Sequence, residues 1–195
     1  MAVAITVVPY DPEWPRRFEA ERAVLDRVLA PWLEAGIHHI GSTAVPGLAS
    51  KPIIDMIAGV RDLEAARAAF DPLAEQKYLY APHRPGIAHH FVKPSLRLPP
   101  ATHGLHLTEP GSDLWRERLA FRDVLRGDAG LAGEYEALKL RLAREHPDDI
   151  GLHRRQARLR RSHARECGSS GRPPLTEPRP VDLGGQRPHV PPLRD

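Results

Sequence analysis

Apolar and polar positions along the chain follow two periods, one typical of helices and the other typical of strands. Apolar residues at helical spacing predict a helix that opens at Asp11 and runs to about Leu33. Similar spacings predict later helices at residues 62–73, 112–126 and 131–145, with Asp62 and Ser112 as caps. Short β-branched or alternating runs predict strands at residues 3–8, 37–40, 52–60, 78–81, 88–92 and 103–108.

The expected strand at residues 52–60 carries a single acid, Asp55, with two apolar residues on each side. Burying a lone carboxylate in such a run is costly unless it is paired, hydrogen-bonded or bound to a metal. Upstream, Gly41-Ser42 predicts a tight turn whose N–H groups and hydroxyl can hold an anion. Lys51 lies just before the strand and can meet a phosphate as a point charge. Small-residue turns are also common as plain strand-to-helix corners, but this combination predicts a phosphate-sized pocket beside an acid.

Histidines form a second group of candidates. His103 and His106 flank an alternating run at odd spacing, so their side chains should point to opposite faces of a strand. His106, between two leucines, is the one we expect to face the pocket. Three imidazoles together with Asp55 could bind a transition metal. The alternative for each single histidine is an ordinary surface or core hydrogen bond. The other members of this group are His83, His89 and His90.

Arginines at helical spacing form a third group. Arg118, Arg122 and Arg126 lie at i, i+4 and i+8, on one stripe of an expected helix. The default interpretation is a solvent-facing row paired with neighbouring acids. The alternative is a clamp for a phosphorylated or acidic ligand. Tyr135, on the last expected helix, is interpreted as a core residue.

The charge of the chain changes sign near residue 150. Residues 152–195 hold ten Arg, no Lys and four acids, a net charge of +6, which leaves −3 for residues 1–151 when taken from the total of +3. We therefore predict one domain over residues 1–150 and a basic, Pro- and Arg-rich disordered tail over residues 151–195. Because the body is mildly acidic, nucleic acid is not an expected partner.

Three features of the sequence bear on the cellular compartment: its cysteine content, its first residues and the length of its apolar runs. Cys167 is the single cysteine, so no internal disulfide can form, as is usual in a reducing compartment. The first residues have neither the basic start nor the long apolar run of a signal peptide. No stretch approaches the roughly 18 apolar residues of a membrane span. These features predict a cytoplasmic protein with no membrane partner.

Five blocks of residues together resemble the GrpB family, a group of small bacterial proteins of poorly defined biochemical role. The resemblance covers residues 5 to about 150, and its most specific part is the run Gly-Ser-Thr-Ala-Val-Pro-Gly that begins at Gly41. The blocks are Val-Val-Pro-Tyr-Asp-Pro-x-Trp-Pro-x-x-Phe from Val7, His-Ile-Gly-Ser-Thr-Ala-Val-Pro-Gly-Leu-Ala-x-Lys-Pro-x-Ile-Asp from His39, His-x-Leu-His from His103, Trp-x-x-x-Leu-x-Phe-Arg-Asp-x-Leu-Arg from Trp115, and Tyr-x-x-Leu-Lys from Tyr135.

The resemblance implies membership of the DNA polymerase beta-like nucleotidyltransferase superfamily. It therefore implies an α/β (α+β) fold, a nucleotidyltransferase-like mixed β-sheet flanked by helices, with a nucleotide or other phosphorylated small molecule as ligand and a divalent metal (Mg, Mn or Zn) as cofactor. The expected phosphate- or nucleotide-binding residues are Gly41, Ser42, Thr43, Lys51 and Arg122. The expected metal ligands are Asp55 and His106, and the expected catalytic residues are Asp55 and Lys51.

One departure from the superfamily pattern affects the expected chemistry. Active members carry a second acid two residues after the first, because two-metal transfer needs two carboxylates, and here Ile57 stands in that place. Asp62 lies beyond the strand, while His106 or Glu109 could complete a site from a neighbouring strand. Nucleotidyl or phosphoryl transfer and a non-catalytic nucleotide-binding or regulatory module are therefore both open, as is association into a homodimer.

A second departure lies after Pro147, where family members usually continue with a Tyr-x-x-x-Lys helix. Here Leu152-His-Arg-Arg-Gln stands in its place. An Arg- and Pro-rich segment without Lys is typical of a shifted frame in a GC-rich gene. We hypothesise that the tail is a frame-shift product or a recent replacement, which reading the other frames of the gene would test.

Overall fold

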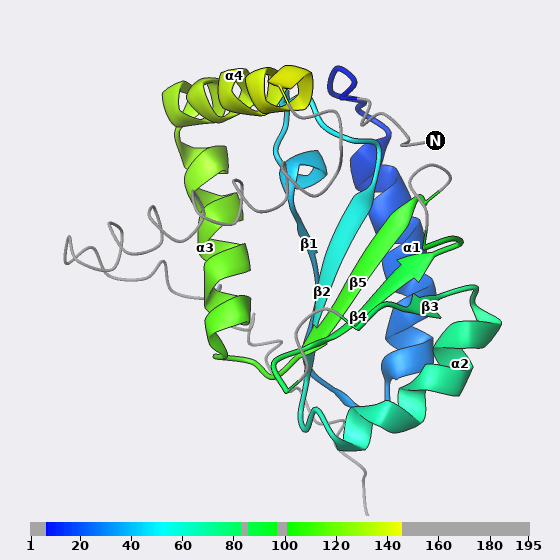
Figure 1. The fold of residues 1–195 in the computed structure, drawn as a ribbon. Helices are drawn as coiled ribbons and strands as arrows, with labels where there is room; N and C mark the ends of the chain where they lie inside the picture. The colour runs from blue at the N-terminus through cyan, green and yellow to red at the C-terminus, as the bar shows by residue number, and fades with distance from the viewer. Residues whose placement is uncertain (1–6, 83–85, 97–100, 146–195) are drawn as a thin grey trace, which may run out of the picture.

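The computed structural model describes residues 7–82, 86–96 and 101–145, which form one mixed sheet with helices on both faces (Figure 1). The sheet order is β1-β2-β5-β4-β3. β2 and β5 pair in parallel and the other neighbours pair antiparallel. The strands are β1 (Leu33–Ile40), β2 (Ile54–Val60), β3 (Leu79–Tyr80), β4 (His89–Lys93) and β5 (His103–Thr108). The expected mixed sheet flanked by helices is thereby confirmed.

Helices lie on both faces of the sheet. Figure 1 shows α1 and α2 on one side of the strands and α3 and α4 on the other. The helices are α1 (Trp14–Leu29), η1 (Ser42–Ala44), η2 (Ala65–Ala69), α2 (Phe70–Glu75), α3 (Asp113–Gly127) and α4 (Ala129–Glu145), of which η1 and η2 are 3-10 helices. Within the described part of the chain, no helix combines the length and the apolar character that crossing a membrane requires.

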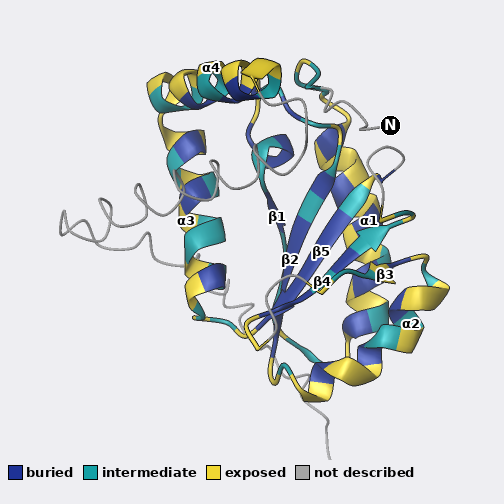
Figure 2. Cartoon of the chain, viewed as in Figure 1, coloured by how far each residue is buried: buried dark blue, intermediate teal, exposed yellow. Residues whose placement is uncertain are grey.

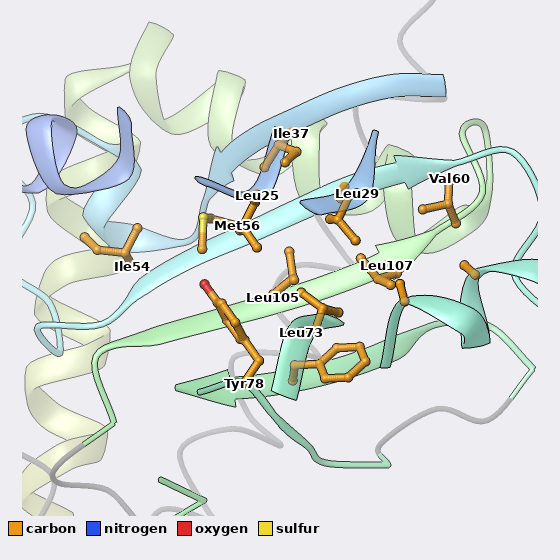
Figure 3. Close-up of a cluster of buried hydrophobic side chains, with 14 of the residues drawn as sticks. Leu25, Leu29, Ile37, Ile54, Met56, Val60, Leu73, Tyr78, Leu105 and Leu107 are labelled. Carbon is orange, nitrogen blue, oxygen red and sulfur yellow. The ribbon is translucent and has the colours of Figure 1, made fainter. Parts of the chain in front are cut away.

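The main core lies between α1 and the sheet. Every second residue of β2, starting with Ile54, is buried on this face, as the period of a strand requires. Leu105 and Leu107 of β5 meet them from the neighbouring strand, and Leu25 and Leu29 of α1 cover them (Figure 3). Fully burying each such side chain contributes about 1.5–3 kcal/mol. Figure 2 shows the resulting band of buried residues along the central strands.

Two smaller apolar clusters hold the helices of the opposite face. Ile57 of β2 packs against Leu114 at the start of α3. Further along α3, Phe121 and Leu125 pack with Tyr135 of α4, which is a core residue as expected. The loop that follows η1 contributes the rest of this second cluster, Val45 and Leu48. Residues of α3 and α4 therefore pack against the connection between β1 and β2.

Several expected boundaries hold and several move. β5 has the expected ends, and Ser112 caps α3 by accepting a hydrogen bond from the Trp115 N–H at 3.2 Å. α1 ends at Leu29, so its expected end at Leu33 is wrong, because Leu33 already pairs with Val60 in the sheet. β1 begins four residues before its expected start, and the ends of the other strands and of the last helix are either as expected or differ by one or two residues.

Two expected elements differ in kind. The helix expected at residues 62–73 is divided into η2 and α2, and the Asp62 carboxylate caps its start by accepting from the Ala65 N–H at 2.6 Å. The strand expected at residues 3–8 is reduced to an isolated bridge between Val8 and Ser50, with residues 3–6 outside the described part. The predicted tail at residues 151–195 and its frame-shift hypothesis also lie outside the described residues.

Candidate functional site

Asp55 lies near the start of β2 with a glycine on each side of its carboxylate. In the sheet it pairs with Ile40 of β1 and with Gly104 of β5. A Cβ atom built on Gly41 would lie 2.9 Å from Oδ2 of Asp55, and one built on Gly104 would lie 2.6 Å from Oδ1. Both distances are shorter than a real contact allows. The two glycines therefore leave the space that the carboxylate occupies.

The turn after β1 brings Gly41 and Ser42 to this carboxylate. Gly41 has φ 74° and ψ −171°, a combination that side chains other than hydrogen adopt at a high cost. The next residues close into η1, where the N–H of Val45 donates to the Ser42 carbonyl at 3.1 Å. Gly41 and Ser42 are both partly exposed. The structure thus places Gly41 against Asp55 at the start of β2, and Ser42 follows it in the turn.

Thr43 has a different role from its two neighbours. Its side chain is 1% exposed, and its hydroxyl donates to the Ile53 carbonyl at 3.0 Å. The same hydroxyl lies 3.0 Å from Nε2 of His39, which must therefore be the donor in that bond. Burial, followed by the charges of Arg126 and Arg122, lowers the pKa of His39 to about 3, so the imidazole is neutral. The Thr43 side chain ties the turn to the entrance of β2.

Two arginines of α3 bind the backbone on either side of this turn. Arg122 Nη1 donates to the His39 carbonyl at 3.2 Å, and Arg126 Nε donates to the Ala44 carbonyl at 2.8 Å. Burial and then the neighbouring Arg122 charge lower the pKa of Arg126. The Arg122 side chain is only 14% exposed, so it does not face solvent, but its Nε donates to Asp123 at 2.7 Å, and the pairing with a neighbouring acid in the default interpretation is confirmed. Arg126, an exposed residue, thus binds the same turn as Arg122, and its i+4 spacing from Arg122 was the signal for it.

His106 shares the face of Asp55, as expected. It pairs with Ile57, two residues after Asp55 on the same face of β2. The ring of His90, from β4, stacks on it with centroids 4.4 Å apart and an angle of 15° between the planes. The point where a Gly104 Cβ would lie is 3.8 Å from Nε2 of His90, so His90 borders the space beside Asp55. The sequence analysis counted His90 among the candidate histidines but did not predict that it lies beside Asp55.

His103 faces the other side of the sheet, as the alternation predicted. There the carboxylate of Glu21, from α1, accepts from the Lys93 ammonium at 2.7 and 2.9 Å and from the Tyr78 hydroxyl at 3.0 Å. His103 Nε2 lies 3.9 Å from the same carboxylate. Burial is the main cause that lowers the pKa of His103, against the opposing charge of Glu21. This cluster is structural, because its members satisfy one another.

A metal site of three or more protein ligands does not form among the described residues. The rings of His90 and His106 stack on each other near Gly104. His89 turns to the other face, where its Nε2 donates to the Leu63 carbonyl at 2.8 Å. His83 lies outside the described part. The three-imidazole centre is therefore not found within the residues that the structure describes.

The carboxylates that could have replaced the missing second acid lie elsewhere. Asp62 follows the far end of β2. Glu109 follows the far end of β5, where its carboxylate accepts from the Leu63 N–H at 3.1 Å. Because Asp55 lies at the opposite end of the same strands, neither acid can reach it. Ile57 itself is fully buried against α3.

Lys51 enters this region from the loop between η1 and β2. It is partly buried, and its carbonyl accepts from the N–H of Ile53 at 2.8 Å. The segment is therefore turned tightly just before Asp55. Two cationic side chains, Arg122 and Arg126, thus bind the backbone around the Gly41-Ser42 turn, and Lys51 lies four residues before Asp55 on the loop that follows this turn.

Comparisons with known proteins agree with the resemblance in the sequence. A family model described as GrpB protein matches residues 4–157. The UPF0157 protein YqkA of Bacillus subtilis is 38% identical over 148 residues, which are 75% of this chain and 42% of YqkA. The glutamate-rich protein GrpB of Alkalihalophilus pseudofirmus is 32% identical over 148 residues, 74% of this chain and 84% of that protein. The chain thus spans less than half the length of YqkA and most of the length of the second relative.

A solved structure matches over nearly all of its own length. The crystal structure of the conserved protein GrpB from Enterococcus faecalis superposes with a TM-score of 0.73 at 28% identity. The match covers 84% of this chain and 99% of that chain. The arrangement of the sheet and its helices is therefore shared with that protein.

Proposed function

The chain belongs to the GrpB family, and on that premise we propose that it binds a nucleotide or another phosphorylated small molecule at the exposed side of the Asp55 carboxylate and the Gly41-Ser42 turn. The observation that carries this proposal is the place of the Asp55 carboxylate between Gly41 and Gly104. A glycine inside a strand such as β5 weakens it and often marks a close approach of a ligand or another group. Two glycines that leave room around one partly exposed acid support a binding role for that acid.

The positive charge around the turn supports an anionic ligand. The charges of Arg122 and Arg126 both act to lower the pKa of His39, and Arg122 lowers the pKa of Arg126. Asp123, paired with Arg122 at 2.7 Å, offsets part of this positive charge, and a bound phosphate would offset more of it. Lys51 adds a further cation on the loop that leads to Asp55. A phosphate group is the ligand chemistry that this arrangement favours.

A divalent cation fits beside the phosphate if the ligand supplies part of its coordination. Magnesium is commonly held by one or two carboxylates together with ligand phosphates and water. Asp55 would be the carboxylate, and His106 follows on the same face. Zinc usually takes three or four protein ligands, and the described residues contain no such group. We therefore propose Mg²⁺ or Mn²⁺, bound together with the ligand.

The fully buried Ile57 favours binding without standard two-metal transfer. A second carboxylate on the face of Asp55 is what such chemistry requires. Ile57 occupies that position and packs with Ala88 and Leu114 in an apolar cluster. A nucleotide-binding or regulatory module is thus favoured over nucleotidyl or phosphoryl transfer by Asp55 and Lys51.

Isothermal titration calorimetry with ATP, CTP and coenzyme A, each with Mg²⁺ or Mn²⁺, tests this proposal. Asp55→Asn keeps the size of the side chain and removes its charge, so we expect it to weaken metal-dependent binding by about tenfold or more. Asp113→Asn is the matched control, because Asp113 is exposed at the start of α3 and pairs with Arg116. This control should leave the affinity unchanged.

An unchanged affinity in Asp55→Asn would remove Asp55 from the site and contradict the proposal. The same protein samples can be assayed for turnover of a labelled nucleotide. Turnover that is lost in Asp55→Asn would favour transfer over simple binding. Nucleotide binding without turnover would support the role as a binding module.

A further inference from the structure

The loop between η1 and β2 is held at Ala49 by two side chains of α4. The N–H of Ala49 donates to Oε1 of Glu136 at 2.7 Å. The carbonyl of Ala49 accepts a short hydrogen bond from the Lys139 ammonium. Both backbone groups of one loop residue are therefore bound by residues that lie close to one helical turn apart on α4.

The burial of Lys139 is unusual for its residue type. The residue is 3% exposed, and burial lowers its pKa to about 8 against the opposing effect of Glu136. Its ammonium lies 5.1 Å from the centre of the Tyr135 ring, which gives a cation–π contact. Lysine is rarely buried to this extent, because removing its charge from water is costly. A methionine would fill a similar volume without that cost, so the packing of α4 alone does not account for a lysine here.

Ala49 lies in the segment that leads into the candidate site. Before it, Leu48 is buried against Phe121 and Tyr135. After it, Ser50 exchanges two backbone hydrogen bonds with Val8, at 2.8 and 2.9 Å. Lys51 follows directly. Only Ser50 lies between Ala49 and Lys51, so the hydrogen bonds at Ala49 and Ser50 together fix the direction in which the chain reaches Lys51.

We propose that Glu136 and Lys139 are positioning residues that set where Lys51 enters the Asp55 site, acting through the backbone of Ala49. The consequence for affinity rests on the proposed function, since Lys51 is the residue that would meet the phosphate. Both residues would act through the Ala49 backbone that they bind. In this way α4, the last described helix, is linked to the candidate site through the backbone of Ala49.

Two variants of Glu136 test the role of the hydrogen bond. Glu136→Ala removes the acceptor of the Ala49 N–H, whereas Glu136→Gln keeps a carbonyl oxygen that can accept the same bond. We expect Glu136→Ala to weaken the binding of ATP with Mg²⁺ about tenfold and Glu136→Gln to stay within about twofold of the wild-type affinity. Lys139→Met removes the donor at similar volume and should weaken binding as Glu136→Ala does.

Tyr78→Phe is the control for a general loss of stability. It removes the hydrogen bond from the Tyr78 hydroxyl to Glu21 on the other face of the sheet. It should lower the melting temperature while leaving the affinity within about twofold of wild type. An equal loss of affinity in Tyr78→Phe and Glu136→Ala would overturn the positioning role.

The backbone amide resonances of Lys51 and Asp55, followed in nitrogen–proton correlation spectra, separate this inference from the proposed function. We expect these resonances to move in Glu136→Ala and to keep their wild-type positions in Glu136→Gln. If the wild-type chain binds no nucleotide, the proposed function fails, while such shifts still support positioning by α4. An unmoved Lys51 resonance in Glu136→Ala would overturn the inference, whatever the affinity.

Discussion

Gly104→Ala probes the close approach between β5 and the Asp55 carboxylate. The added methyl group would lie 2.6 Å from Oδ1 of Asp55, and its next contacts, Asp55 Cγ and His90 Nε2, are both at 3.8 Å. Gly104 has no positive φ, so its backbone accepts alanine. Replacing glycine in a strand contributes about 0.5–1 kcal/mol of stability, because the unfolded chain loses freedom. Displacing a packed side chain costs about 1–3 kcal/mol. We expect a net loss of about 1 kcal/mol in the free energy of unfolding.

Removing the carboxylate should relieve this loss. Asp55→Ala should leave the fold nearly intact, since an acid kept for a site is usually not a source of stability. The double variant of Gly104→Ala and Asp55→Ala should be at least as stable as Asp55→Ala alone, which gives a coupling free energy of about 1–2 kcal/mol. Gly41→Ala is the contrast. Its Cβ would also meet the carboxylate, at 2.9 Å, but its positive φ strains any side chain. Asp55→Ala should therefore rescue Gly41→Ala only in part, because the backbone strain remains.

Urea denaturation of the full chain measures these free energies, provided that the slopes of the transitions agree among the variants. A coupling between positions 55 and 104 below about 0.5 kcal/mol would refute the reasoning, since independent sites add within that margin. Equal rescue of Gly41→Ala would refute it in another way. It would show that the clash, and not the backbone conformation, accounts for glycine at position 41.

Two further predictions concern buried charges. Glu21→Gln should lower the free energy of unfolding by about 2 kcal/mol, because it leaves the Lys93 ammonium, whose side chain is 23% exposed, without its carboxylate. Glu19→Gln, which alters an exposed pair on the same helix, should change it by less than about 0.5 kcal/mol, and equal effects in urea denaturation would contradict the assignment. Burial lowers the pKa of Lys139 to about 8, so above that pH the unfolded chain binds more protons than the folded chain, and stability should rise with pH from about 8 to 10. Lys139→Met should flatten that rise in thermal melts, and an equally steep rise in this variant would contradict the prediction.

Local sequence patterns predicted correctly those elements that begin and end at turn or capping residues. β5 alternates apolar and polar residues between turn residues, and Ser112 precedes the helical spacing of α3, so both were placed correctly. The end of α1 was placed four residues too late, because Trp32 and Leu33 continue its apolar spacing. Pairing of Leu33 with Val60 draws this segment into the sheet instead. A contact with a residue far along the chain thus overrides the local pattern.

The sequence by itself determined the family, the mixed sheet that the family implies, and the meeting of Gly41 and Ser42 with Asp55. These follow from short segments, because a glycine turn and an acid in an apolar run are readable within a few residues. Only the tertiary structure decided that Gly104 is the second glycine beside the carboxylate and that His90 borders the same space. It also decided that Arg126 and Lys139 bind the carbonyls of Ala44 and Ala49. The physical reason is that strand register and the packing of α3 and α4 bring these distant residues together, and no local period specifies either of them.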